Sequence, residues 1–132
     1  MQARFIPVPQ ARREEMSDII KQYPAKPARV YFYATCLVDL FYPEGGLAGI
    51  QLLEREGIEV IFPQHQSCCG QPAYTSGLNG QARTVAASQL ELFPEDWPVV
   101  VPSGSCAGML RKHYPRLFAG TGLAEQAEQL AG

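Results

Sequence analysis

Four cysteines are the residues of this sequence best able to carry chemistry. They stand at three places: Cys36, the adjacent pair Cys68 and Cys69 followed by Gly70, and Cys106. Comparable distances separate these places, because 31 residues lie between Cys36 and Cys68, and 35 lie between Gly70 and Cys106. A disulfide between adjacent cysteines strains the peptide that joins them, so Cys68 and Cys69 are better suited to binding the same ligand. We therefore expect the fold to gather all four thiols at one place.

The four thiols suit a soft metal centre. Thiolates favour zinc and iron–sulfur clusters over hard cations. Structural zinc sites usually present cysteines in closely spaced knuckles, which this sequence lacks. Cysteines from three separate segments are closer to a preformed cluster pocket. The sequence therefore favours an iron–sulfur cluster, with a zinc-binding scaffold as the alternative, on the ligands Cys36, Cys68, Cys69 and Cys106.

Two other interpretations of the cysteines stay open. They could be buried apolar side chains, since free cysteine is among the most buried residue types. Four cysteines at three equivalent positions are unusual under that interpretation. They could also react directly with a disulfide substrate, although the sequence has no Cys-x-x-Cys motif of the thioredoxin kind.

Several neighbours of the cysteines are candidates for contact with a bound cofactor. Met109 lies three residues after Cys106 and shares its helical face, so it could be a weak thioether ligand, a lid or a packing residue. Gly70 would let the backbone approach a bulky ligand closely. Further donors to cluster sulfurs are expected at the helix start, from Ser103, Gly104 and Ser105.

Other polar residues near the cysteines carry weaker signals. His65 is interpreted as an exposed loop residue rather than a ligand, and His113 as a surface residue. Asp39 is the only carboxylate near the expected site, so catalysis by paired acids has no support. A Gly-x-Gly-x-x-Gly nucleotide loop is also absent.

Three short strands are expected to position the cysteines. Apolar, β-branched and aromatic runs predict strands at 29–34, 58–62 and 98–101, and each runs into a segment that holds a cysteine. Helical periodicity predicts helices at 11–22, 46–56, 78–92, 105–118 and 122–131. Strands that alternate with helices predict a parallel sheet, whose carboxyl edge is where ligands bind. We therefore predict an α/β fold, a small three-layer Rossmann-like sheet with helices on both faces and the cysteines at the C-terminal ends of the strands.

The composition bounds the class of protein. The chain has 132 residues, a length that suits one domain. Its net charge of −2 argues against nucleic acid as a partner. It has no run of about 20 apolar residues, so no membrane span is predicted. We expect a cytoplasmic protein, in which thiols stay reduced and bind metals rather than form disulfides. Residues 1–27 are expected to form a helix and a proline-rich connector, and residues 28–132 a single domain.

With these residues in view, the chain resembles the cysteine-rich CCG domain family. The family pattern is a lone cysteine, then Cys-Cys-Gly, then Cys-x-x-Cys, which here falls on Cys36, on 68–70 and on 106–109. Members include iron–sulfur subunits of heterodisulfide reductase, glycolate oxidase and lactate-utilisation systems. The phrases at 68–74, 102–109 and 113–115 look most like the lactate-utilisation branch. The resemblance covers roughly residues 28–120.

The resemblance implies a cytoplasmic oxidoreductase subunit that holds a 4Fe–4S cluster. In the lactate branch it implies oxidation of L-lactate to pyruvate together with two partner subunits, one of them a ferredoxin-like iron–sulfur subunit. The last cysteine of the family pattern is Met109 here, which puts a cluster with five cysteine ligands in doubt. Family members usually carry two such domains, so this chain resembles the N-terminal half of a longer protein.

Overall fold

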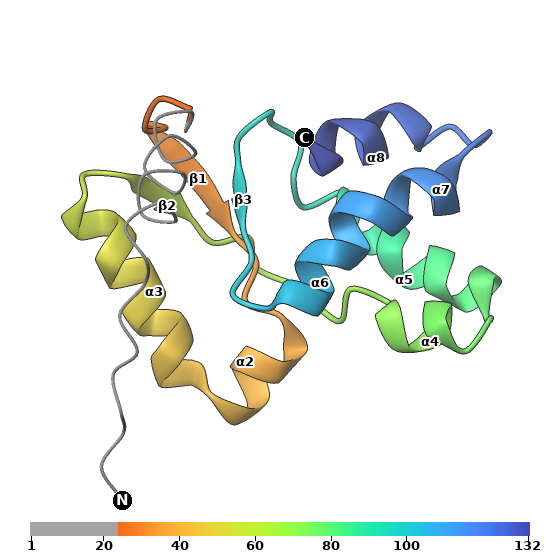
Figure 1. The fold of residues 1–132 in the computed structure, drawn as a ribbon, viewed down its shortest axis with the longest axis horizontal. Coiled ribbons are helices and arrows are strands. Elements are labelled where there is room, and N and C mark those ends of the chain that lie inside the picture. The colour runs from red at the N-terminus through yellow and green to blue at the C-terminus, as the bar shows by residue number, and fades with distance from the viewer. Residues whose placement is uncertain (1–23) are drawn as a thin grey trace, which may run out of the picture.

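The computed structural model describes residues 24–132. They form a three-stranded parallel sheet surrounded by helices (Figure 1). The expected helix at 11–22 lies outside the described residues, the expected connector at Pro24 and Pro27 has no helix or strand, and the domain boundary at residue 28 stays a prediction. None of the helices within residues 24–132 has the length and apolar character needed to cross a membrane.

The sheet is built around its first strand. The strands are β1 (Arg29–Phe32), β2 (Glu59–Ile61) and β3 (Val99–Val100), in the order β2-β1-β3. Strand β1 pairs in parallel with both neighbours, with Tyr31 opposite Ile61 on one side and Val99 on the other. The predicted α/β fold with a parallel sheet is therefore confirmed, with strands somewhat shorter than expected.

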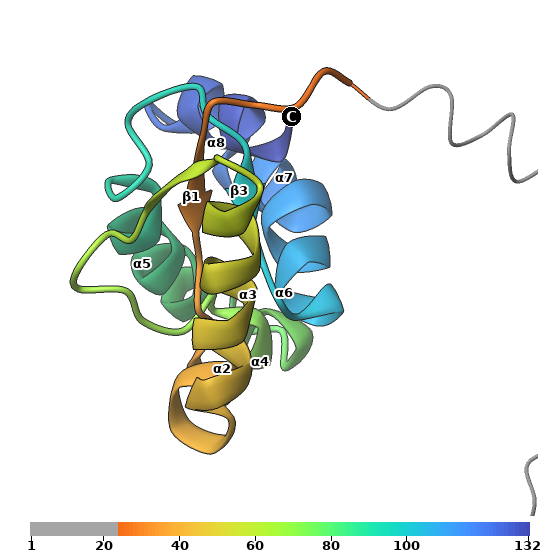
Figure 2. The same ribbon diagram turned by 90° about the vertical axis from the view of Figure 1, so that its left-hand side faces the viewer.

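Helices cover both faces of the sheet, as seen with the sheet viewed from its β2 edge (Figure 2). Helix α3 (Pro43–Arg55) packs on the face that carries Phe32, with Gly49 next to the aromatic ring. Helix α5 (Asn79–Leu90) lies on the other face, with Tyr31 and Tyr33. It buries one stripe at helical spacing, formed by Ala82, Ala86, Gln89 and Leu90.

The C-terminal helices lie beside β3, on the side away from β2 (Figure 1). Helix α6 (Gly104–Gly108) continues through a π-helical turn, η1 (Met109–His113), into α7 (Tyr114–Phe118). In that turn the N–H of Tyr114 donates to the carbonyl of Met109, five residues back. Helix α8 (Ala124–Ala131) then packs against α7. The expected single helix at 105–118 is thus present, with one wider turn inside it.

Two short helices were not expected from the sequence. Helix α2 (Cys36–Phe41) follows β1 directly, and α4 (Gln71–Thr75) follows the cysteine pair. Helix α3 also begins earlier than predicted, at Pro43, because proline fits the first turn of a helix. These differences matter because α2 and α4 adjoin three of the four cysteines.

Candidate metal centre

The first cysteine is held at the start of α2. Cys36 is the first residue of that helix, and Thr35 caps it by accepting a hydrogen bond at Oγ1 from the N–H of Val38 (3.3 Å). Thr35 is buried and has φ of 62°, a conformation that costs a β-branched residue about 1–3 kcal/mol. The backbone is therefore strained at Thr35, the residue that caps the helix carrying Cys36.

The adjacent cysteines lie in an irregular segment between β2 and α4. Gly70 ends this segment with φ of 85° and begins α4. A Cβ added to Gly70 would lie 3.1 Å from the carbonyl oxygen of Ala82. Glycine is therefore needed here for its left-handed backbone and for the approach of α5. Closeness to a ligand, the reason expected for Gly70, stays a prediction.

The four thiols are arranged as two pairs. The buried pair is Cys69 and Cys106, with 2% and 4% of their surfaces exposed and their Sγ atoms 3.5 Å apart. The outer pair is Cys36 and Cys68, which are both half-buried and close enough for Cys68 to raise the pKa of Cys36. All four are free thiols. The fold thus brings thiols from three separate segments near one another, with a direct contact between Cys69 and Cys106.

Burial raises the pKa of two of these thiols, Cys36 and Cys69. Loss of solvation raises the pKa of Cys69 to about 12, opposed by a backbone hydrogen bond from Gln71 and reinforced by the bond with Cys106. Burial also raises the pKa of Cys36, and the neighbouring Cys68 adds to the effect. Metals bind thiolates, so binding at this site must release protons.

A single metal ion has no prepared site in the described part of the chain. Within residues 24–132, no three side chains among the histidines, cysteines, aspartates and glutamates are gathered so that they could hold an ion. The donor set itself is purely sulfur and is divided between two pairs. A group that used all four thiols would have to span both pairs.

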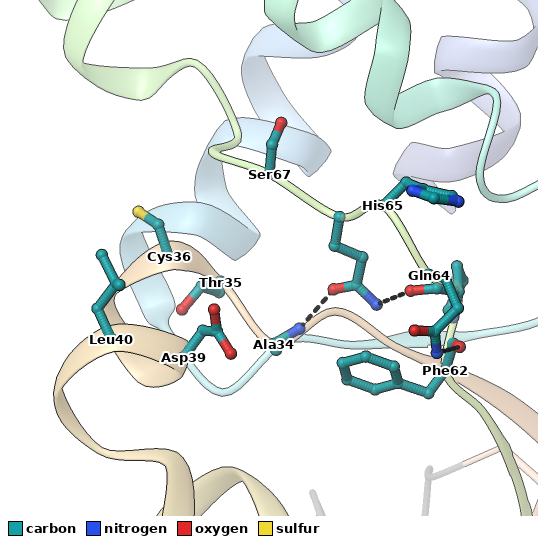
Figure 3. Close-up of a pocket in the computed structure, with 11 residues that line it drawn as sticks. Ala34, Thr35, Cys36, Asp39, Leu40, Phe62, Gln64, His65 and Ser67 are labelled. Atoms are coloured by element: carbon teal, nitrogen blue, oxygen red, sulfur yellow. Dashed lines mark hydrogen bonds between the residues drawn. The ribbon is translucent and has the colours of Figure 1, made fainter.

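A pocket of about 260 Å³ opens beside Cys36, one thiol of the outer pair (Figure 3). The start of α2 contributes Thr35, Cys36 and Asp39, and the segment after β2 contributes His65 and Ser67. The imidazole of His65 points away from Cys36, in agreement with its interpretation as a loop residue that is not a ligand (Figure 3). Cys36 is therefore the thiol that a small molecule in this pocket could reach.

The other residues singled out in the sequence are placed as follows. Met109 is fully buried in the same apolar cluster as the buried pair, as a packing residue would be, and its contact with a cofactor stays a prediction. Ser103 and Ser105 face each other, with their Oγ atoms 3.3 Å apart. His113 was expected at the surface, which is wrong: it is half-buried and its ring lies 4.6 Å from that of Tyr74.

Three polar side chains near the cysteines were not foreseen. Tyr33, Gln89 and Tyr114 are all buried, and all hydrogen-bond to residues 67–69. Burial raises the pKa of both tyrosines, so their hydroxyls stay protonated and act as donors. A buried polar residue on a helix with an otherwise apolar stripe, such as Gln89 on α5, is the sequence signal that could have pointed to them.

Comparison with known proteins places this site in a family. The model of the family described as CCG, cysteine-rich domain, matches residues 30–111, which include all four cysteines. Lactate utilization protein A of Geobacillus sp. (strain WCH70) is 51% identical over 92 residues, which are 70% of this chain and 38% of that protein. The protein of the same name from Macrococcus caseolyticus is 48% identical over 90 residues, 68% of this chain and 36% of that protein.

A third relative, Lactate utilization protein A of Geobacillus thermodenitrificans, is 47% identical over 104 residues. These are 78% of this chain and 43% of that protein, so the chain spans less than half the length of the curated relatives it matches. No solved structure matches the chain. Because the family model matches most of the chain and contains its four thiols, the chain belongs to the CCG cysteine-rich domain family.

Proposed function

We propose that this domain holds a 4Fe–4S cluster and transfers electrons within a lactate-utilisation system. The ligands would be Cys36, Cys68, Cys69 and Cys106. The observation that carries the proposal is the convergence of these thiols, from three separate segments, into the buried and outer pairs. The names of the relatives supply the pathway.

A bound cluster would supply one-electron chemistry. The chain's own residues would bind and shield it. Cys69 and Cys106 would anchor it in the apolar interior, where Met109 and Leu110 keep water away. Cys36 would hold its outer side, next to the pocket.

The oxidoreductase activity itself would need partners. Electrons would pass between a 2-hydroxy acid/2-oxo acid couple, such as lactate and pyruvate, and other subunits of a cytoplasmic complex, including a ferredoxin-like iron–sulfur subunit. The parts of the relatives that this chain does not match would belong to the same assembly.

Anaerobic reconstitution with iron and sulfide tests the cluster. We expect about four irons and four sulfides per chain, with an electron paramagnetic resonance signal on reduction. Cys69→Ser should lose the bound iron, whereas Thr84→Ala, an exposed change on α5, should keep it. Absence of bound iron in the unaltered protein would refute the proposal, and about one zinc per chain without visible absorbance would support the zinc scaffold instead.

The buried pair supports a second candidate, a thiol–disulfide reductase. Its two sulfurs are 3.5 Å apart, so two thiols could become one disulfide while a disulfide substrate takes up the two electrons and two protons released. Counting free thiols before and after incubation with oxidised glutathione separates the candidates. Loss of two thiols per chain, without any requirement for iron, would favour this one.

A further inference from the structure

The segment that carries the adjacent cysteines, residues 66–70, has no regular secondary structure of its own. Side chains from three different elements hydrogen-bond to it instead. We call Tyr33, Gln89 and Tyr114 the loop clamp. Tyr33 directly follows β1, Gln89 belongs to α5 and Tyr114 belongs to α7. None of these three residues is a cysteine.

The two tyrosines of the loop clamp hold carbonyl groups on either side of Cys68. The Oη of Tyr33 donates to the carbonyl of Ser67 at 2.5 Å. The Oη of Tyr114 donates to the carbonyl of Cys69 at 2.8 Å. Both tyrosines have no exposed surface, so these bonds are shielded from water and fix the direction of the main chain.

Gln89 completes the clamp from the other side of the loop. Its Oε1 accepts the N–H of Ser67 at 2.9 Å, and its Nε2 donates to the Oγ of Ser67 at 2.8 Å. A buried amide is costly unless its hydrogen bonds are made, and the loop supplies the partners that satisfy it. The hydrogen bonds of Gln89 are therefore satisfied when the loop has its folded conformation.

Fixing the main chain also fixes where the two adjacent thiols point. Cys69 contacts Cys106 in the interior, with their Sγ atoms 3.5 Å apart, while Cys68 is half-buried and lies toward Cys36. Neighbouring residues of an unwound chain tend to point to opposite sides, so a rotation of the loop would exchange or misplace the two thiols. The clamp bonds at Ser67 and Cys69 oppose that rotation.

We propose that Tyr33, Gln89 and Tyr114 are positioning residues that set the divergent directions of Cys68 and Cys69 before any cofactor binds. The importance of those directions for a cofactor rests on the proposed function, but the positioning itself does not. It is a property of the metal-free protein and can be measured there.

The test compares Tyr114→Phe and Tyr33→Phe with Tyr31→Phe. Tyr31 is an equally buried tyrosine of β1, but its hydroxyl accepts from the N–H of Glu95, away from the cysteine loop. In the metal-free protein, the rate of Cys69 alkylation by iodoacetamide should rise about tenfold in the two clamp variants and stay within about twofold in Tyr31→Phe. Ser67→Ala, which removes one clamp bond without altering the core, should give a smaller rise in the same direction.

The same variants should also change a loaded site. After reconstitution, Tyr114→Phe should shift the reduction potential and the paramagnetic resonance spectrum, and Tyr31→Phe should leave both unchanged. Equal rates of Cys69 alkylation in all the variants, or equal increases in the clamp variants and Tyr31→Phe, would overturn the proposal. If the unaltered protein binds no iron, the proposed function fails, while the alkylation rates still decide the role of the clamp.

Discussion

The buried pair and the outer pair are chemically identical and differ in their surroundings. Cys69 and Cys106 lie in the apolar core with fully buried neighbours such as Met109. Cys36 and Cys68 are half-buried, Cys36 lines a pocket, and no side chain of α2 is buried within the described part of the chain. One half of the site is therefore part of the domain's core, and the other half adjoins its least buried helix. This division separates anchoring of a cofactor from access to it.

The two pairs should differ most in their rates of thiol alkylation. In the metal-free protein, iodoacetamide should modify Cys36 and Cys68 at least about 100-fold faster than Cys69 and Cys106, because reaction of the buried thiols requires local opening and a thiolate. Mass spectrometry of the peptides at successive times gives the four rates. Similar rates at all four positions would abolish the distinction, and equal reactivity in urea serves as the control.

Substitution of Gly70 should loosen the buried pair. Gly70→Ala should lower the free energy of unfolding by about 1–3 kcal/mol, because alanine disfavours positive φ and its Cβ would press on the carbonyl of Ala82. Gly57→Ala is the matched control, since Gly57 has φ of +75° and nothing within 4 Å of the added Cβ.

Chemical denaturation measures both of these variants. The loss in Gly70→Ala should exceed that in Gly57→Ala, and Cys69 should become more reactive while Cys36 does not. Equal losses in the two variants would mean that the contact with α5 contributes nothing.

Alkaline pH should weaken the fold through the buried pair. The pKa of Cys69 rises from 9.0 to about 12 on folding, so its protonated form is favoured in the native state. That contribution to stability is complete below pH 9 and is lost as the pH rises toward 12. Unfolding curves should therefore show less stability at about pH 11 than at about pH 8, and Cys69→Ala should reduce the difference. An unchanged pH dependence in Cys69→Ala would show that the thiol is not the group responsible.

Changes at the exposed surface of α2 should have the smallest effect. Phe41 is 78% exposed, so Phe41→Ser should change the free energy of unfolding by no more than about 0.5 kcal/mol. Phe118→Ser, at a position 1% exposed, is the contrasting variant and should cost about 3 kcal/mol or more. A large loss in Phe41→Ser would place α2 in the cooperative core and remove the contrast between the two halves of the site.

Sequence patterns predicted the sheet and its main helices well. Strands that alternate with helices can be connected in only a few ways. The parallel sheet around β1 could therefore be predicted from local sequence patterns. Helix α2 was missed because its apolar residues include no buried face, and α4 because five residues give too little periodicity. The π turn was also missed, since a 3.6-residue period cannot register it.

The site was predictable in its residue types and only partly in its arrangement. The cysteines drew attention because their chemistry is rare, whereas the loop clamp depends on contacts between residues up to 45 positions apart. Tyrosine and glutamine on apolar faces resemble ordinary core and surface residues until their hydrogen-bond partners are known. The division into a buried and an outer pair likewise depends on tertiary packing.

The π turn at η1 makes the length of the chain between Cys106 and Tyr114 a determinant of the site. An α-helix advances about 100° per residue, so closing the wide turn into regular α-helix without removing a residue would rotate all that follows by roughly that angle. The hydroxyl of Tyr114 would then turn away from the carbonyl of Cys69, although every other side chain of the site kept its identity. Among relatives, the number of residues in this turn is therefore as informative as their types, because a one-residue gap there marks a helix whose tyrosine can reach the loop without the wide turn.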